Sequence, residues 1–189
     1  MSFTIRPAVE SDFDAIAAIY AEAVEHGTAS FELTVPDRAE MISRHKALVS
    51  QNYPYLVLED ERGVRGYSYA GPYRARPAYR FVVENSVYLD SEARGRGYGR
   101  ALLVELISAC QALGFRQMIA VIGDSANLAS VRVHASCGFT MTGTLKDMGW
   151  KHGRWLDTVL MQLPLGRGGD APADAESIPG RMNAIFKTP

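Results

Sequence analysis

A glycine-rich turn between a predicted strand and a predicted helix constrains the fold of this chain more than any other feature. The turn reads Arg94-Gly95-Arg96-Gly97-Tyr98-Gly99-Arg100, and the apolar stretch before it, residues 80–89, is typical of a strand. After the turn, apolar residues recur at helical spacing until Gly114, a residue type that commonly ends helices; they are Leu102, Leu103, Leu106, Ile107, Cys110 and Leu113. A strand, turn and helix of this kind require a sheet on which the helix can pack.

The turn is suited to bind an anion. Its glycines allow a ligand to approach the backbone closely, and the first N–H groups of the following helix point outward with a dipole that favours negative charge. Its three arginines add charge-assisted hydrogen bonds to phosphate, so the expected ligand is a pyrophosphate. The glycine spacing does not fit G-x-G-x-x-G, and no Lys-Ser or Lys-Thr follows, which disfavours NAD and ATP. An ordinary turn with solvated arginines is the alternative.

The rest of the chain predicts a mixed sheet. Further strands are expected at residues 3–6, 55–58, 64–70 and 118–122 and on both sides of a turn at His152-Gly153, the second of these being 155–163; helices are expected up to Gly27 and at residues 37–49 and 127–136. Antiparallel strands at the start therefore meet a parallel strand–helix–strand unit in the middle. This order predicts the α/β class, with an α+β type of mixed sheet.

Composition divides the chain into a domain and a tail. From Gly166 onward the sequence is rich in Gly, Ala, Pro and Asp, with acidic and basic residues in balance. We expect one domain at residues 1–165 and a flexible or peripheral tail at residues 166–189, in which residues 182–186 are apolar enough to dock on a neighbouring surface.

Charge and cysteine content exclude several classes of protein. The chain has 189 residues, 47% of them hydrophobic, and a net charge of −1, which argues against a disordered chain or a non-specific nucleic-acid binder. Its two cysteines, Cys110 and Cys137, form neither a disulfide framework nor a C-x-x-C metal pair, so we expect no metal site. No stretch approaches the roughly 18 apolar residues of a membrane span. We expect a soluble protein of a reducing cytoplasm with no nucleic-acid or membrane partner.

The glycine-rich turn resembles a known motif. Arg94-x-x-Gly97-x-Gly99 is similar to the Arg/Gln-x-x-Gly-x-Gly/Ala motif of the Gcn5-related N-acetyltransferase (GNAT) superfamily, in which the turn holds the pyrophosphate of acetyl-CoA. The resemblance implies the GNAT acyl-CoA N-acyltransferase fold, a central mixed sheet of about seven strands flanked by about four helices. It also implies that Asn127 contacts the cofactor.

Four further segments resemble the phosphinothricin acetyltransferase subfamily, whose relatives act on methionine sulfoximine and methionine sulfone. These are residues 70–79, 84–89, 120–123 and 151–155. The resemblance implies a homodimer that uses acetyl-CoA as co-substrate and acetylates the α-amino group of a small amino-acid analogue by direct attack in a ternary complex. The chain departs from the herbicide-resistance enzymes in having Arg74 where they often have Lys and Pro77 where they tend to have Asn.

Glu84 is the candidate general base. Along a strand, Glu84, Ser86 and Tyr88 share one face, opposite to Val83, Asn85 and Val87. A carboxylate about 10 residues before the pyrophosphate turn lies toward the acyl end of a cofactor that runs antiparallel to the strand. The subfamily resemblance implies the same role. The alternative is a structural Glu paired with an arginine such as Arg80.

His134 is the candidate general acid. It lies four residues before Gly138-Phe139, where many superfamily members have Tyr and the phosphinothricin subfamily has His. A histidine near neutral pKa can donate or accept a proton. The alternative is a structural histidine, hydrogen-bonded where a helix meets a strand. Cys137 is expected to fill the core, because direct attack by an amine needs no covalent enzyme intermediate.

The resemblance also assigns binding residues. The extended, amide-bearing pantetheine arm adds to a strand edge through main-chain hydrogen bonds. For the cofactor, the assigned residues are Val87, Tyr88, Leu89, Arg94, Gly95, Arg96, Gly97, Tyr98, Gly99, Arg100 and Asn127. For the acceptor we expect Arg74, Arg76 and Tyr79, which lie in the loop before this strand, and Glu84 and Ser86 on the strand itself; to these the resemblance adds Phe31, which covers the substrate. The two loop arginines favour a substrate with a carboxylate and a second anionic or strongly polar group.

Three other functions are open at this point. The same fold can acetylate peptide N-termini or polyamines, although two arginines at the acceptor loop favour an acidic small molecule. A non-catalytic CoA-binding module would bind the cofactor without turnover. A nucleic-acid binder built on the Arg-Gly sequence is disfavoured, because the turn lies between a strand and a helix and the net charge is slightly negative.

Overall fold

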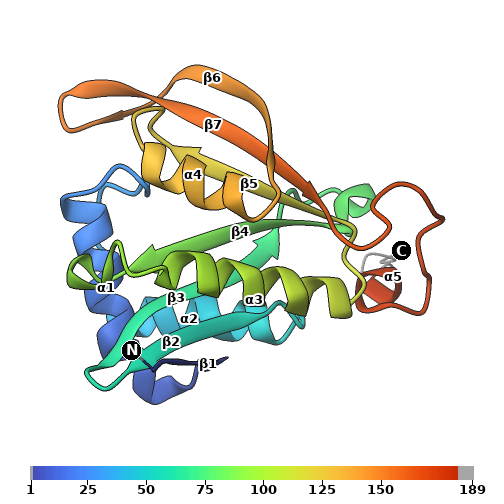
Figure 1. Cartoon of the computed structure of the whole chain (residues 1–189), viewed down its shortest axis with the longest axis horizontal. Helices are drawn as coiled ribbons and strands as arrows, with labels where there is room; N and C mark the ends of the chain where they lie inside the picture. The colour runs from blue at the N-terminus through green and yellow to red at the C-terminus, as the bar shows by residue number, and fades with distance from the viewer. Residues whose placement is uncertain (1, 183–189) are drawn as a thin grey trace.

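A seven-stranded mixed sheet organises residues 2–182, the part of the chain that the computed structural model describes (Figure 1). The strands are β1 (Thr4–Pro7), β2 (Tyr55–Asp60), β3 (Gly63–Pro72), β4 (Val82–Leu89), β5 (Gln117–Gly123), β6 (Thr140–Lys151) and β7 (Arg154–Pro164). Their order across the sheet is β1-β2-β3-β4-β5-β7-β6, and β4 with β5 is the parallel pair. The structure confirms the predicted α/β class with a mixed sheet.

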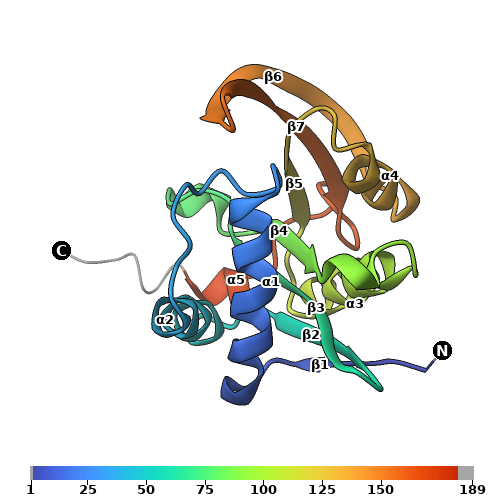
Figure 2. The same ribbon diagram turned by 90° about the vertical axis from the view of Figure 1, so that its left-hand side faces the viewer.

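Helices cover both faces of the sheet. They are α1 (Phe13–Glu25), α2 (Arg38–Val49), α3 (Tyr98–Ala112), α4 (Leu128–Ser136) and the single-turn α5 (Ile178–Arg181), with short 3-10 turns at Glu10–Asp12, Pro77–Tyr79 and Ser91–Ala93. Figure 2 shows α1 and α2 on one side of the sheet and α3 on the other. None of the helices in residues 2–182 is both long and apolar enough to cross a bilayer.

Strand alternation builds a separate core beneath each helical layer. On β2, Val57 is fully buried among residues of α1 and α2, whereas its neighbour Leu58 is fully buried among residues of α3. Successive side chains point to opposite faces of a strand, so a continuous apolar run such as residues 55–58 serves both layers. β4, two strands away in the sheet, contributes to both cores, with Val83 in the α3 core and Tyr88 packed against the α1–α2 core.

The sheet splits between β4 and β5. These strands pair only from Val82 to Asn85 on β4 and from Gln117 to Ala120 on β5. Beyond that point β4 continues to Leu89 beside β3, and β5 continues to Gly123 beside β7. The last four residues of β4 therefore have no strand partner on the β5 side, and the two halves of the sheet diverge (Figures 1 and 2).

Residues 166–182 pack against the end of α3. The Arg116 side chain donates hydrogen bonds to the carbonyl oxygens of Gly168 (2.8 Å) and Ala171 (3.1 Å), and Met182 is buried with the α3 core. The tail predicted at residues 166–189 is described as far as Met182. The rest of the expected docking stretch, residues 183–186, lies outside the described residues.

Candidate active site

A small cavity lies at the point where β4 and β5 diverge. Its volume is about 50 Å³, and its walls come from β4, β5, α4 and the segment after α1; the lining includes Ala29, Asn85, Ser86, Val87, Tyr88, Gly123, Asn127, Ser130 and His134. The split thus brings together predicted residues from positions 86, 87, 88, 127 and 134, which are far apart in the sequence. Asn127 also caps α4, where its Oδ1 accepts a hydrogen bond from the Ser130 backbone N–H.

The glycine-rich turn lies at the N-terminus of α3 and presents its backbone outward. Gly95 (φ 77°) and Gly97 (φ 82°) have left-handed conformations that favour glycine, and a Cβ at either position would meet nothing within 4 Å. Gly97 is the N-cap of α3, so the N–H groups that follow it have no acceptor within the helix. The turn therefore offers open space and free donors, as an anion site requires.

The side chains of the turn differ in how they are held. Arg94 forms an exposed ion pair with Glu22 at 3.1 Å, and Arg100 is exposed. The Tyr98 side chain is buried, and its hydroxyl donates to Asp60 Oδ2 at 3.0 Å on the outer side of the turn. Arg96 lies beside this same tyrosine hydroxyl. At Tyr98, the group left facing outward is the backbone N–H rather than the ring.

Glu84 lies on the α1–α2 face of β4, just before the split. It is half-buried, and burial raises the pKa of its carboxyl group above the usual range. Its carboxylate forms no hydrogen bond or ion pair with any residue within 2–182, although its backbone pairs with β3 and β5. Arg80, the alternative partner considered above, stacks instead over the Phe81 ring at 4.6 Å and donates to the Pro77 carbonyl oxygen. A half-buried carboxylate without a counter-ion is free to accept a proton.

His134 lies on the opposite side of β4, in contact with the cavity. Its Nδ1 is 2.8 Å from the Ser130 carbonyl oxygen, and its Nε2 is 2.9 Å from Asn85 Oδ1. Asn85 is oriented in turn by its Nδ2, which donates to the Ile119 carbonyl oxygen at 3.1 Å. Burial lowers the pKa of His134, and the Ser130 contact opposes this shift. The ring is thus held where a helix meets a strand and also lines the cavity.

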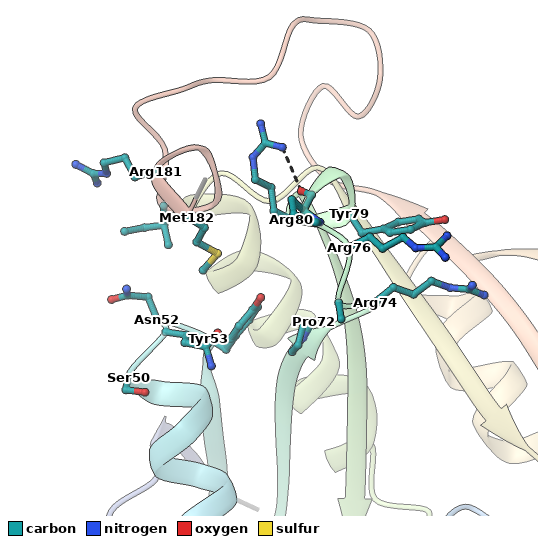
Figure 3. A pocket seen from close by; sticks show the side chains of 14 residues that line it. Ser50, Asn52, Tyr53, Pro72, Arg74, Arg76, Tyr79, Arg80, Arg181 and Met182 are labelled. Carbon is teal, nitrogen blue, oxygen red and sulfur yellow. Dashed lines mark hydrogen bonds between the residues drawn. The ribbon is translucent and has the colours of Figure 1, made fainter. Parts of the chain in front are cut away.

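The predicted acceptor loop lies before β4. The Arg74 guanidinium stacks over the rings of Tyr73 and Tyr79 at 5.2 and 5.9 Å, and Arg76 is exposed. Figure 3 shows the side chains of Arg74, Arg76 and Tyr79 pointing away from a cavity of about 470 Å³ whose opposite wall includes Tyr53 and Met182. The three residues also help to line this larger cavity, while the ends of their side chains are grouped on the other side of the loop.

The remaining predicted acceptor residues approach the split from the α1–α2 side. The Ser86 hydroxyl is hydrogen-bonded to Tyr69. Phe31 is about a third exposed, at 38%, and its ring lies against Gly123 and Gly149. One residue of this region was missed from the sequence, namely Asn85. Its position on the strand face opposite to Glu84 was predicted, but its contact with His134 was not.

The family assignment follows from a model described as an acetyltransferase (GNAT) domain, which matches residues 5–160. The chain belongs to the GNAT acetyltransferase family. It is 50% identical over 165 residues to a phosphinothricin N-acetyltransferase of Alcaligenes faecalis, covering 87% of this chain and 84% of that protein. It is 40% identical over 173 residues to an L-methionine sulfoximine/L-methionine sulfone acetyltransferase of Pseudomonas paraeruginosa, covering 91% and 100%.

A solved structure agrees with the GNAT assignment. A GNAT superfamily phosphinothricin acetyltransferase from Sinorhizobium meliloti, in complex with AcCoA, superimposes with a TM-score of 0.92 at 50% identity. The match covers 95% of this GNAT chain and 97% of that one. The predicted family and fold are confirmed.

Proposed function

We propose that this GNAT enzyme transfers the acetyl group of acetyl-CoA to the α-amino group of a small amino-acid analogue such as phosphinothricin, methionine sulfoximine or methionine sulfone. The observation that carries the proposal is the Glu84 carboxylate, which is half-buried, without an ion-pair partner among residues 2–182, and placed where β4 leaves β5. The relatives described above support the substrate class.

The split in the sheet fits acetyl-CoA. An extended arm with amide groups can bind along the unpaired edge of β4, through the main chain of Val87, Tyr88 and Leu89. The pyrophosphate then falls at the N-terminus of α3, where glycine conformation leaves the backbone open. Arg94, Arg96 and Arg100 supply positive charge there. When bound, acetyl-CoA supplies the acyl group at the Glu84 end of the strand.

Glu84 prepares the amine. An α-amino group is mostly protonated at neutral pH and attacks a thioester only after it loses a proton. Burial raises the pKa of Glu84, which makes its carboxylate a stronger base than an exposed glutamate. The neighbouring Ser86 and Tyr69 are hydrogen-bonded to each other on the same face and complete the polar wall around this base.

His134 handles the proton on the other side of β4. It lines the cavity in which the thiol end of the cofactor would lie, and Asn85 holds its ring in one orientation. Both ring nitrogens face protein acceptors, the Ser130 carbonyl oxygen and Asn85 Oδ1, and burial favours the neutral ring with a single N–H. In the proposed step this N–H gives its proton to the departing thiolate once the thiolate takes the place of one of these acceptors.

The acceptor loop recognises the rest of the substrate. Arg74 and Arg76 are exposed cations that suit a carboxylate and a second polar group, and Tyr79 supports the Arg74 guanidinium. Phe31 covers the side of the acceptor pocket opposite to these loop residues. We also propose that the enzyme works as a homodimer in the cytoplasm, as the resemblance to the subfamily implies.

Turnover of acetyl-CoA with a panel of amines tests the function. The panel contains phosphinothricin, methionine sulfoximine, methionine sulfone, ordinary amino acids, a polyamine and an N-terminal peptide. We expect the first three to give the highest kcat/KM. A preference for the peptide or polyamine would replace the substrate class, and acetyl-CoA binding without turnover of any amine would make the protein a CoA-binding module.

A further inference from the structure

The segment after α1, residues 27–32 (the Phe31 segment), is fastened to the end of the β6–β7 hairpin. Figures 1 and 2 show this segment beside the turn that joins β6 to β7. Lys151, the last residue of β6, donates from Nζ to the Ser30 carbonyl oxygen at 2.7 Å. The next residue, His152, contacts the Gly27 carbonyl oxygen at 3.1 Å. Two adjacent hairpin residues thus hold both ends of a short, irregular stretch.

Lys151 makes its contact in a buried place. The side chain is only 4% exposed, and burial lowers the pKa of its amine. A buried ammonium group is costly unless it is well hydrogen-bonded, so its bond to the Ser30 carbonyl oxygen is a strong constraint on the segment. The Ser30 hydroxyl is in turn 3.0 Å from the Tyr20 hydroxyl. The Tyr20 ring meets the Tyr88 ring of β4 edge-on at 5.1 Å.

The Phe31 ring occupies a notch formed by two glycines. A Cβ added to Gly149 of β6 would lie 2.7 Å from two ring carbons of Phe31. A Cβ added to Gly123 of β5 would lie 2.9 Å from the ring and 2.3 Å from the Thr28 carbonyl oxygen. Real Cβ atoms do not approach other atoms this closely, so any larger residue at either position displaces the ring or the segment. Neither glycine has a positive φ, so close approach is the reason for glycine here.

We propose that Gly149, Gly123 and Lys151 are positioning residues that set where the Phe31 ring lies over the acceptor side of β4, and through it how the amine substrate fits. The proposal rests on the proposed function and deepens it. Gly123 ends β5 at the cavity, while Gly149 and Lys151 belong to the hairpin, so the acceptor site depends on an element that contributes none of the proposed proton-transfer groups. The Phe31 ring is held in place by its contact with Gly149 of this hairpin.

Gly149→Ala provides the main test, with Gly143→Ala as its matched control. Both glycines are in β6, and a Cβ at Gly143 would meet nothing within 4 Å. For Gly149→Ala we expect the KM for the amine to rise about fivefold while the KM for acetyl-CoA stays within about twofold. Gly143→Ala should leave both constants unchanged. Equal behaviour of the two variants in an enzyme with measurable turnover would overturn the proposal.

A double-mutant cycle tests whether Gly149 affects substrate binding through the Phe31 ring. If Gly149 acts through the ring, Gly149→Ala should have little further effect on the amine KM in a Phe31→Ala background. An undiminished effect there would mean that Gly149 acts without Phe31, which also overturns the proposal.

Amide hydrogen exchange supplies a readout that does not need activity. Lys151→Met should raise the exchange rates of residues 27–32 by about tenfold and leave those of α3 unchanged. Unchanged exchange in the Phe31 segment would contradict the role of Lys151. If no amine is turned over, the proposed function fails while this measurement still decides whether the hairpin holds the segment.

Discussion

Asn85 Oδ1 lies 2.9 Å from His134 Nε2, and this contact joins β4 to α4 where the pairing of β4 with β5 ends. The Asn85 amide therefore contacts both elements that border the split, β5 and α4. Its Nδ2 donates a hydrogen bond to the Ile119 carbonyl oxygen of β5. Its Oδ1 orients the His134 ring, which lines the cavity between the diverging strands. With Glu84 preceding it on the opposite face, two adjacent residues of β4 place the proposed base, Glu84, and the proposed acid, His134, on either side of one strand.

Replacing Glu84 with Gln should raise the stability of the fold and lower the turnover of the enzyme. The pKa of Glu84 is raised on folding, so the folded chain binds its proton more tightly than the unfolded chain. The carboxylate therefore destabilises the fold as pH rises above the usual glutamate value, and Glu84→Gln removes this cost. At pH 7 we expect a gain of about 1 kcal/mol, or about 2–4 °C in Tm, with loss of most turnover.

Thermal unfolding of both proteins between pH 4 and pH 7.5 provides the check on Glu84. The difference in Tm should close at the acid end, where the wild-type carboxyl is protonated in both states. A constant difference across this range would exclude an electrostatic origin, and unchanged turnover would remove Glu84 from the mechanism.

Gly97→Ala should weaken acetyl-CoA binding beyond its effect on folding. A Cβ there forces a non-glycine residue into a left-handed conformation, at about 1–2 kcal/mol, and also occupies the space above the N-terminus of α3. Gly63→Ala is the control, because Gly63 has φ 97° and equally open surroundings in the β2–β3 turn. Both variants should lose similar stability, and Gly97→Ala alone should raise the acetyl-CoA KM, by about tenfold. Matching KM values would argue against the turn as the pyrophosphate site.

Asn85→Asp should raise the pKa of His134. Burial lowers this pKa in the wild type, and a carboxylate 2.9 Å from Nε2 would favour the imidazolium form. An NMR titration of the imidazole protons measures the change directly. We expect an upward shift and a matching displacement of the pH profile of kcat. A shifted titration with an unmoved profile would mean that His134 has a structural role only.

Arg116→Ala should loosen residues 166–182 without affecting catalysis. The guanidinium holds the carbonyl oxygens of Gly168 and Ala171, and its loss should cost about 1–2 kcal/mol. Arg132→Ala on α4 is the control, since the Arg132 side chain is exposed and forms no hydrogen bond or ion pair with residues 2–182. Denaturant titration and amide exchange in residues 166–182 give the result. An equal loss of stability in both variants would show that these contacts do not hold the tail.

The sequence pattern predicted the features of this enzyme that depend on local order. The glycine-rich turn was identifiable because a strand precedes it and a helical repeat follows it, and Glu84 because strand alternation gives its face. The contact of Asn85 with His134 was not predictable, since it joins residues 49 positions apart that the split in the sheet brings together. Composition distinguished the region after Gly166 as a flexible or peripheral tail but gave no sign that Arg116 would bind it. The Phe31 notch was missed for a similar reason, because Gly123 and Gly149 carry no motif and meet the ring only in the folded chain.

The short seam between β4 and β5 has a consequence for how the enzyme unfolds. Four residue pairs join two antiparallel half-sheets that are each extensively paired within themselves. A ligand lying in the split touches both halves, so part of its binding free energy goes into coupling them. At a concentration of 100 times Kd such a ligand adds about 2.7 kcal/mol to the stability of the whole. Bound along β4 as proposed above, acetyl-CoA would act as a missing stretch of sheet, and the enzyme would unfold most cooperatively with its co-substrate in place.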